Sequence, residues 1–200
     1  EMRVAGVRGF VTWTSGRWDE ARTQLEAVIR LAAHRGRYDE FDGFMARHWL
    51  ILASHYAGDS QRALELAGEL IAAGTADLLR YSRGAQLHVF RSIEQGSLEL
   101  AERLLEYWEL HLPAQPVSQS RFNLEATRLS LWTAQGRFED AIQLAHDRAE
   151  IMRAAGCQLS SWHRAMWHLP ALEAAARLAR RDAAAPRPSR ELIEQAEDLV

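Results

Sequence analysis

The sequence contains no lysine, so all 24 of its basic residues are arginine. It has one cysteine, Cys157, which excludes an intrachain disulfide and is consistent with a reducing compartment. Its longest apolar runs, such as residues 49–53, are far shorter than the roughly 20 residues that span a bilayer. With 48% hydrophobic residues, the chain has enough apolar material for a core, and we expect a folded, soluble domain.

The charge balance and the first residues bear on partner and location. A net charge of −3 argues against nucleic acid as the main partner, because phosphate binding normally needs a basic face. The opening stretch EMRVAGVRGF has neither the basic and apolar regions of a signal peptide nor an initiator Met. We therefore expect a domain from a larger cytoplasmic protein. The arginine and alanine bias suggests a GC-rich bacterial genome.

One short pattern returns along the chain. The hexamer GRWDEA at residues 16–21 recurs as GRFEDA at residues 136–141. A glycine followed five residues later by alanine occurs four times, at intervals of 42, 38 and 40 residues; the four pairs are Gly16/Ala21, Gly58/Ala63, Gly96/Ala101 and Gly136/Ala141. Apolar residues then follow at spacings of three and four, as in Ala21, Leu25 and Val28, so each glycine precedes an amphipathic helix.

A second helical pattern precedes each of the later glycines, over residues 44–56, 85–93 and 122–133. The second helices are predicted to stop at Gly36, Gly74, Pro113 and Gly156, residues that commonly end helices. Because strand-like alternation is almost absent, the chain is predicted to be all-α.

The pattern predicts one continuous domain of about five helical hairpins, approximately residues 1–36, 38–74, 77–113, 117–156 and 159–200. The fifth is the least regular. Ser160 or Ser161 could cap its first helix, Pro170 could kink it, and the stretch ELIEQAEDLV reads as its second helix.

The recurrent residues have physical roles in such a hairpin. Glycine permits a sharp reversal or a left-handed backbone angle, and alanine five residues later lets two helices approach closely. The aromatic residues Trp18 and Phe138, two positions after their glycines, are expected to cover the end of the hairpin and to touch the next one. Since a lone hairpin leaves one apolar face exposed, several must stack into a solenoid.

The four Gly-x4-Ala blocks resemble tetratricopeptide repeats, whose second helix opens with Gly-x-aromatic-x-x-Ala, over residues 1–156. In the first helix of that family a small residue is expected, which Gly9 matches, whereas Ile51, Val89 and Leu129 occupy the position in the other blocks. The period of about 40 also exceeds the usual 34 or so. Longer, degenerate repeats of this kind resemble the superhelical sensor regions of bacterial LuxR-type ATP-binding regulators.

The resemblance implies a right-handed superhelix whose first helices line a concave wall. A register fixed on the four glycines predicts the residues that face this groove. They are Arg3, Phe10 and Trp13 from the first hairpin, His48, Leu52 and His55 from the second, Arg83, Gln86 and Phe90 from the third, and Asn123, Thr127 and Ser130 from the fourth. Such a surface suits a peptide, a partner helix or a small ligand. Alternatively, the aromatic residues among them pack between neighbouring helices.

Other candidate chemistry is weaker. His48 and His55 share a helix face but lack nearby acids, so capping or solvated histidines are favoured over a metal site. The stretch SSWHRAMWH contains Ser161 and His163, which could suggest a hydrolase site, but the nucleophile-elbow motif G-x-S-x-G is absent. The start of a helix with aromatic packing explains this stretch better. The arginine cluster of residues 177–190 is diluted by acidic neighbours and reads as a solvated face.

Two classes of function follow. The first is a non-catalytic module that binds a protein or peptide, or associates with itself, as part of a larger bacterial regulatory protein. The second is a region that senses a small-molecule inducer for a transcriptional regulator. No constellation supports an enzyme, and no cofactor or metal is expected. Clamping of a chaperone tail is disfavoured, since such clamps use Lys and Asn, and the chain has only Asn123.

Overall fold

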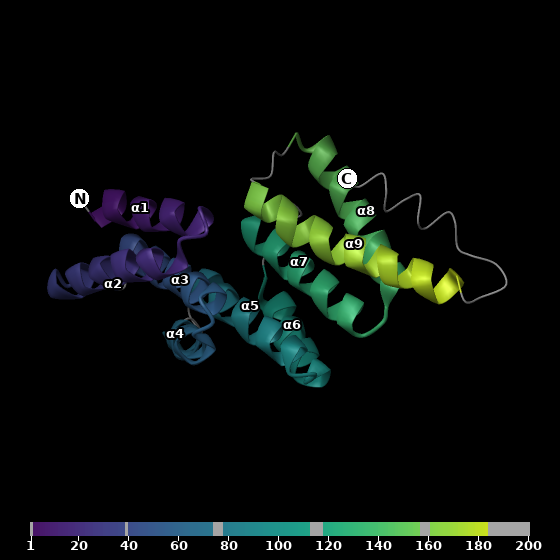
Figure 1. Cartoon of the computed structure of the whole chain (residues 1–200), viewed down its shortest axis with the longest axis horizontal. Helices are drawn as coiled ribbons and strands as arrows, with labels where there is room; N and C mark the ends of the chain where they lie inside the picture. Colours follow the sequence, from purple (N-terminus) through teal and green to yellow (C-terminus); the bar gives the residue numbers. More distant parts are fainter. Residues whose placement is uncertain (1, 39, 74–77, 113–117, 157–160, 184–200) are drawn as a thin grey trace. The chain divides into compact units, whose positions relative to one another are not determined.

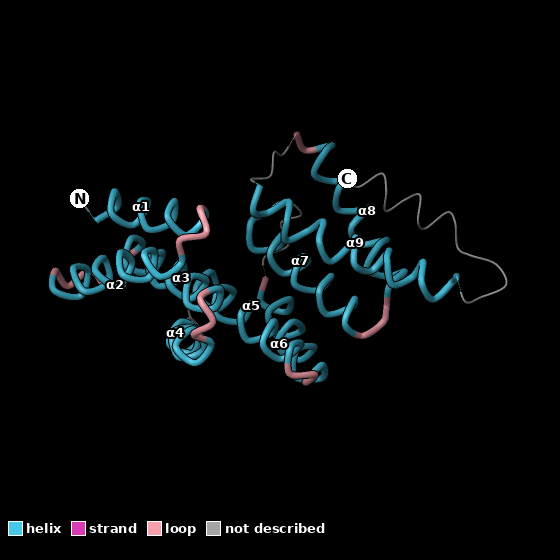
Figure 2. The backbone as a smooth tube through the Cα atoms, viewed as in Figure 1, coloured by secondary structure: helices cyan, strands magenta, loops and turns pink. Residues whose placement is uncertain are grey.

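The computed structural model describes residues 2–38, 40–73, 78–112, 118–156 and 161–183. Within these ranges helices are the only regular secondary structure and there is no strand, which confirms the prediction that the chain is all-α (Figures 1 and 2). The helices are α1 (Met2–Thr14), α2 (Trp18–His34), α3 (Phe41–Tyr56), α4 (Ser60–Ala73), α5 (Leu78–Glu94), α6 (Leu98–His111), α7 (Gln119–Ala134), α8 (Phe138–Ala154) and α9 (Ser161–Ala183).

The four glycines of the repeat all lie in the same kind of turn between two helices. Each has a left-handed φ, between 73° and 85°, which L side chains rarely adopt. In the turn at Gly16, the glycine N–H donates to the Trp13 carbonyl and the Arg17 N–H donates to the Thr12 carbonyl. The same two bonds recur at Gly58, Gly96 and Gly136. This Schellman arrangement satisfies the last carbonyl groups of one helix and lets the next begin at once.

The predicted helix ends are confirmed where the structure describes them. Gly36 and Gly156 follow α2 and α8 with φ of 66° and 65°. Gly74, Pro113 and the expected last helix at residues 191–200 lie outside the described residues. Pro170 does not interrupt α9, which continues from Ser161 to Ala183.

The alanines of the repeat lie in the core. Ala21, Ala63, Ala101 and Ala141 are all fully buried. Gly9 in α1 is equally constrained, because a Cβ on it would lie 2.7 Å from Cδ2 of Leu25 in α2. The four alanines are thus buried, as the predicted close helix packing requires, and a close approach of two helices is seen at Gly9.

The aromatic residues that follow two of the turn glycines contact the next hairpin, as expected. The ring of Trp18 lies 5.8 Å from the ring of Tyr56, at the end of α3. Phe138 packs against the core that α7, α8 and α9 share, and the guanidinium of Arg181 in α9 lies 5.9 Å from its ring centre.

The chain divides into two compact units, Glu1–His88 and Val89–Val200, and the division falls within α5. In the first unit, α1, α2 and α3 pack on one another and α4 packs on α3. In the second, α6 packs on α7, and α7, α8 and α9 pack on one another (Figure 1). Each unit thus contains two paired helices that are covered by a third. In the first unit α3 packs on α1 and α2, and in the second α9 packs on α7 and α8. One continuous domain over residues 1–200 stays a prediction.

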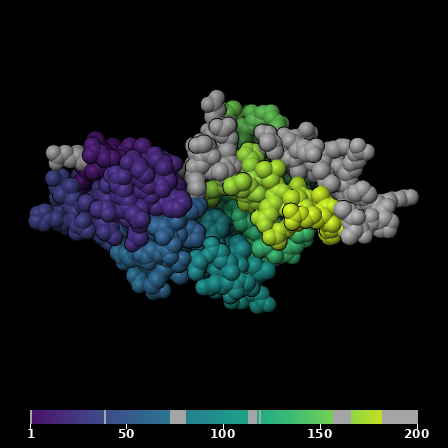
Figure 3. All heavy atoms as spheres, in the orientation of Figure 1, coloured from purple at the N-terminus to yellow at the C-terminus, as the bar shows by residue number. Residues whose placement is uncertain are grey.

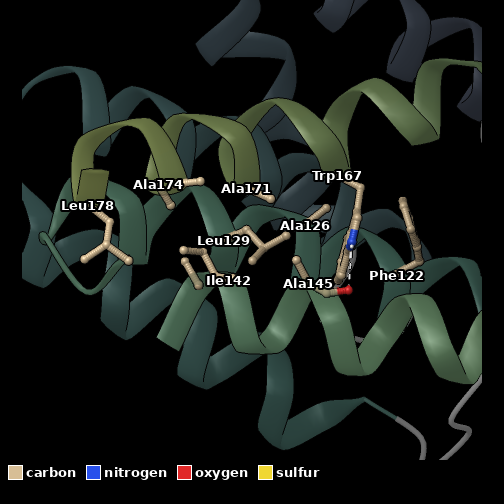
Figure 4. Packing of buried hydrophobic residues seen from close by; sticks show 11 residues of the cluster. Phe122, Ala126, Leu129, Ile142, Ala145, Trp167, Ala171, Ala174 and Leu178 are labelled. Carbon is tan, nitrogen blue, oxygen red and sulfur yellow. Dashed lines mark hydrogen bonds between the residues drawn. The ribbon is translucent and has the colours of Figure 1, made fainter. Parts of the chain in front are cut away.

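The core of the second unit lies between α7, α8 and α9 (Figure 4). Trp167 of α9 is inserted beside Phe122, with ring centres 5.2 Å apart, and its Nε1 donates to the Ala145 carbonyl at 3.4 Å. Small residues, Ala171 and Ala174 among them, line the same face of α9. Burial of this face provides most of the driving force for packing the helix.

Candidate functional site

The first three groove residues lie on α1. Arg3 is exposed and forms an ion pair with Asp42 of α3 at 3.2 Å. Phe10 is half-buried, and its ring lies 5.6 Å from Trp13 and 5.0 Å from Trp49. Trp13 is buried. Phe10 and Trp13 therefore take part in packing α1 against α3, which is the alternative that the sequence left open for the aromatic residues.

The second set lies on α3. His48 is buried, while Leu52 and His55 are half-buried. The ring of His55 meets the edge of the neighbouring Tyr56 ring at 5.2 Å. Trp49, the next residue along α3, lies against Gly6 and Phe10 of α1. His48 is therefore on a different side of α3 from the one that faces α1.

The third set lies on α5, on both sides of the division between the units. Arg83 and Gln86 are buried in the first unit, and Phe90 is half-buried in the second. Gly84, next to Arg83, faces α4, since a Cβ there would lie 2.5 Å from the Ala67 carbonyl oxygen. Close approach of α5 to α4 thus fixes how α5 is rotated.

The fourth set lies on α7 in the second unit. Asn123 and Thr127 are buried, and Ser130 is half-buried. The Thr127 hydroxyl donates to the Asn123 carbonyl at 2.7 Å, and the Ser130 hydroxyl donates to the Ala126 carbonyl at 3.4 Å. Both hydroxyls are thus directed at their own helix. The Asn123 amide nitrogen Nδ2 is buried with no hydrogen-bond partner among the described residues.

Two of the predicted groove residues, His48 and Arg83, have pKa values lowered by burial. Burial, and then the positive charge of Arg83, lower the pKa of His48 well below its usual value. Burial lowers the pKa of Arg83 to about 10, so its guanidinium is still charged at neutral pH. The first unit therefore holds a buried charged guanidinium and a buried neutral imidazole.

Five of the twelve predicted groove residues are buried polar groups: His48, Arg83, Gln86, Asn123 and Thr127. A ligand that reached them would have to enter between helices. Arg3, at the other extreme, is exposed at the side of α1.

The second unit contains a charged cluster that the sequence pattern did not predict. Glu109 accepts from Arg128 at 2.7 Å and from Arg121 at 3.3 Å, and Glu125 pairs with Arg148. The pKa of Glu109 is lowered, chiefly by its hydrogen bond with Arg128, whereas burial raises the pKa of Glu125. The spacing of Arg121 and Glu125, four residues apart on a helix, was a visible signal for part of this cluster.

A second missed residue is Arg47, buried in α3. Its guanidinium lies 4.1 Å from the centre of the Tyr38 ring, and Nη2 donates to the Tyr38 carbonyl at 3.2 Å. The cation is thus held by an aromatic face and a backbone oxygen in the turn that leads into α3.

Several large apolar side chains are exposed on single helix faces. On α1, Val4, Val7 and Val11 are 65%, 48% and 52% exposed. The space-filling view shows α1, in purple, at the surface of its unit (Figure 3). Other exposed apolar side chains occur on α6, at Leu100, Tyr107 and Leu110, and on α9, at Leu169 and Leu172.

The structure adds little on the remaining candidates for catalytic or charged sites. The side chains of Ser161 and His163 lie outside the described residues, as do Arg187 and Arg190. Arg177 and Arg181 form ion pairs with Glu173 and Glu139. Within the described ranges no group of three or more His, Cys, Asp or Glu is placed to hold a metal ion, and no helix is long and apolar enough to span a membrane.

Comparison with family models, with curated proteins and with solved structures finds no match to this chain.

Proposed function

We propose that the chain is a non-catalytic module that binds another protein. Its helix pairs repeat as the right-handed α-solenoid of about five antiparallel hairpins that the resemblance to tetratricopeptide repeats implies. The supporting observation is the equivalence of the four glycine turns, each followed five residues later by a fully buried alanine. Units that each bury a face against the next build an extended surface, and such arrays commonly serve as binding scaffolds.

The contact surface of this proposal is the exposed face of α1. Val4, Val7 and Val11 recur at spacings of three and four, which aligns them in one apolar stripe. An exposed apolar stripe on a helix is typical of surfaces that contact other proteins. A second copy of this chain is the simplest partner, because the stripe of one copy can cover the same stripe of another around a two-fold axis.

Light scattering over a range of protein concentrations tests the proposal. The expected result is a dimer that dissociates on dilution, and Val7→Glu should leave only the monomer because it places a charge in the stripe. Thr23→Glu is the matched control, since it adds the same charge at an exposed position of α2 in the same unit. A wild-type chain that remains monomeric at every concentration contradicts self-association through α1.

A second candidate function is recognition of a small molecule, as the sensor region of a larger cytoplasmic bacterial regulator. The burial of Arg83 and His48 favours it, because a charge removed from solvent is out of reach for the flat surface of a partner protein. A monomeric chain whose melting temperature rises with a small ligand would support this function over the first.

A further inference from the structure

A second exposed apolar surface, besides the α1 stripe of Val4, Val7 and Val11, lies on α6 in the second unit. Leu100 and Tyr107 are both 44% exposed, and Leu110 is 80% exposed. Their spacings of seven and three residues align them along one side of the helix, which we call the α6 stripe. The His111 ring lies 4.2 Å from the Tyr107 ring, and its Nδ1 lies 2.8 Å from the Tyr107 carbonyl oxygen. The α6 stripe thus presents a stacked aromatic ring between two leucines.

The two stripes carry opposite charges at their margins. The α1 stripe is flanked by Arg3 and Arg8, and α1 has no acidic residue. The helix α6 has four glutamates and a single arginine, Arg103, and its residues Glu99 and Glu106 are exposed beside the stripe. Among these five side chains only Arg3 forms an ion pair with another described residue. The other charges are therefore available to a partner.

These charges distinguish two ways of covering the α1 stripe. Against the α1 stripe of a second copy, the arginines of one helix meet the arginines of the other, and no acid of α1 balances them. Against the α6 stripe, the same arginines meet a helix with a net negative charge, which Arg103 reduces but does not reverse. Like charges placed opposite one another oppose association, whereas opposite charges favour it. The α6 stripe is therefore the better partner surface.

We propose that the α1 stripe of one copy binds the α6 stripe of a second copy. The valines then pack against Leu100, Tyr107 and Leu110, and the arginines of α1 lie beside the glutamates of α6. This inference rests on the proposed self-association through α1, and it names the surface that α1 contacts. Two-fold symmetry permits such a contact to be made twice, with α1 of each copy on α6 of the other, so a dimer is still expected.

Two complementary variants test this contact by light scattering. Val7→Glu blocks the α1 stripe and Leu110→Glu blocks the α6 stripe, so each variant alone should be monomeric. An equimolar mixture should contain a dimer with one chain of each kind, because the intact α6 stripe of the first variant accepts the intact α1 stripe of the second. If α1 stripes paired only with each other, the mixture would contain no such dimer, since one of the two stripes is blocked.

A charge reversal tests the electrostatic part of the contact. Glu106→Arg should weaken dimerisation by about tenfold, because it places a cation opposite the arginines of α1. Glu150→Arg is the matched control, since it makes the same reversal at an exposed position of α8 in the same unit, and it should leave the dissociation constant unchanged. Combining Glu106→Arg with Arg8→Glu should restore part of the affinity.

The outcomes separate this inference from the proposed function. If Leu110→Glu dimerises as well as the wild type while Val7→Glu does not, self-association through α1 stands and the α6 contact is wrong. A mixture of the two variants that stays monomeric also overturns the α6 contact. A wild-type chain that is monomeric at every concentration overturns both. Because Leu110 is 80% exposed, Leu110→Glu should keep the helical circular dichroism of the wild type, which shows that loss of the dimer is not loss of the fold.

Discussion

A Cβ atom on Gly84 of α5 would lie only 2.5 Å from the carbonyl oxygen of Ala67 in α4. It would also lie 2.7 Å from Cγ1 of Ile71. The backbone atom cannot move aside as a flexible side chain could, so the two helices approach as closely as they do only because residue 84 has no side chain.

Gly84→Ala should therefore destabilise the chain by about 1–3 kcal/mol, although alanine is the better helix former. Gly68→Ala in α4 is the matched control, because a Cβ there meets nothing within 4 Å. That change should stabilise by roughly 0.5–1 kcal/mol. Urea unfolding measures both, and equal effects at the two sites would show that α5 does not press on α4.

Ala101→Leu tests the close packing that the repeat imposes in the second unit. Ala101 is fully buried, so a larger side chain should overpack the helix pair and cost about 1–3 kcal/mol. Ala176→Leu makes the same change at an exposed position of α9 and should be nearly neutral. Unchanged stability of Ala101→Leu in the same unfolding assay would count against a tight interface.

His48 makes stability depend on pH. Its folded-state pKa is lowered by burial and then by Arg83, so the unfolded chain, with a value of about 6.5, binds the proton more readily. Stability is therefore complete above that value and falls as the pH decreases below it, by up to about 1.4 kcal/mol per pH unit.

Unfolding free energies of the wild type and His48→Leu between pH 5 and 7 measure this contribution. The variant should show the shallower dependence. His88, whose pKa is also lowered by burial, contributes with the same sign in both proteins and cancels in the comparison. Parallel curves would mean that His48 is solvated.

The pair Glu125 and Arg148 should show strong coupling. Arg148→Met removes the hydrogen-bonded cation of a buried carboxylate and leaves Arg121 at 4.0 Å, so it should cost up to about 3–5 kcal/mol. The double variant Glu125→Leu/Arg148→Met removes both charges and should recover most of this loss. A double-mutant cycle with no interaction energy would show that the two charges do not meet in solution.

The turns were predictable because their causes are local. The left-handed angle at Gly16 or Gly136 and the close contact at Ala21 or Ala141 depend on a few neighbouring residues, which the sequence displays at regular intervals. Local rules also explain why α2 and α8 end just before Gly36 and Gly156. The sequence could not decide whether Pro170 would break α9, since tertiary packing can retain such a helix.

The candidate site was predictable only in part. A repeat register assigns His48, Arg83 and Thr127 to one wall, but whether that wall is open depends on how successive pairs pack, which no short pattern encodes. Arg47 and Arg148 were missed because arginine is usually exposed, and their partners become visible only when distant segments meet.

The equivalence of the four glycine turns is tested most directly by backbone NMR of the whole chain. We predict a left-handed φ at Gly16, Gly58, Gly96 and Gly136. We also predict slow amide exchange at the residue after each glycine, because the N–H of that residue donates to the carbonyl five residues earlier. A right-handed φ or rapid exchange at any of the four turns would contradict a repeated helix pair.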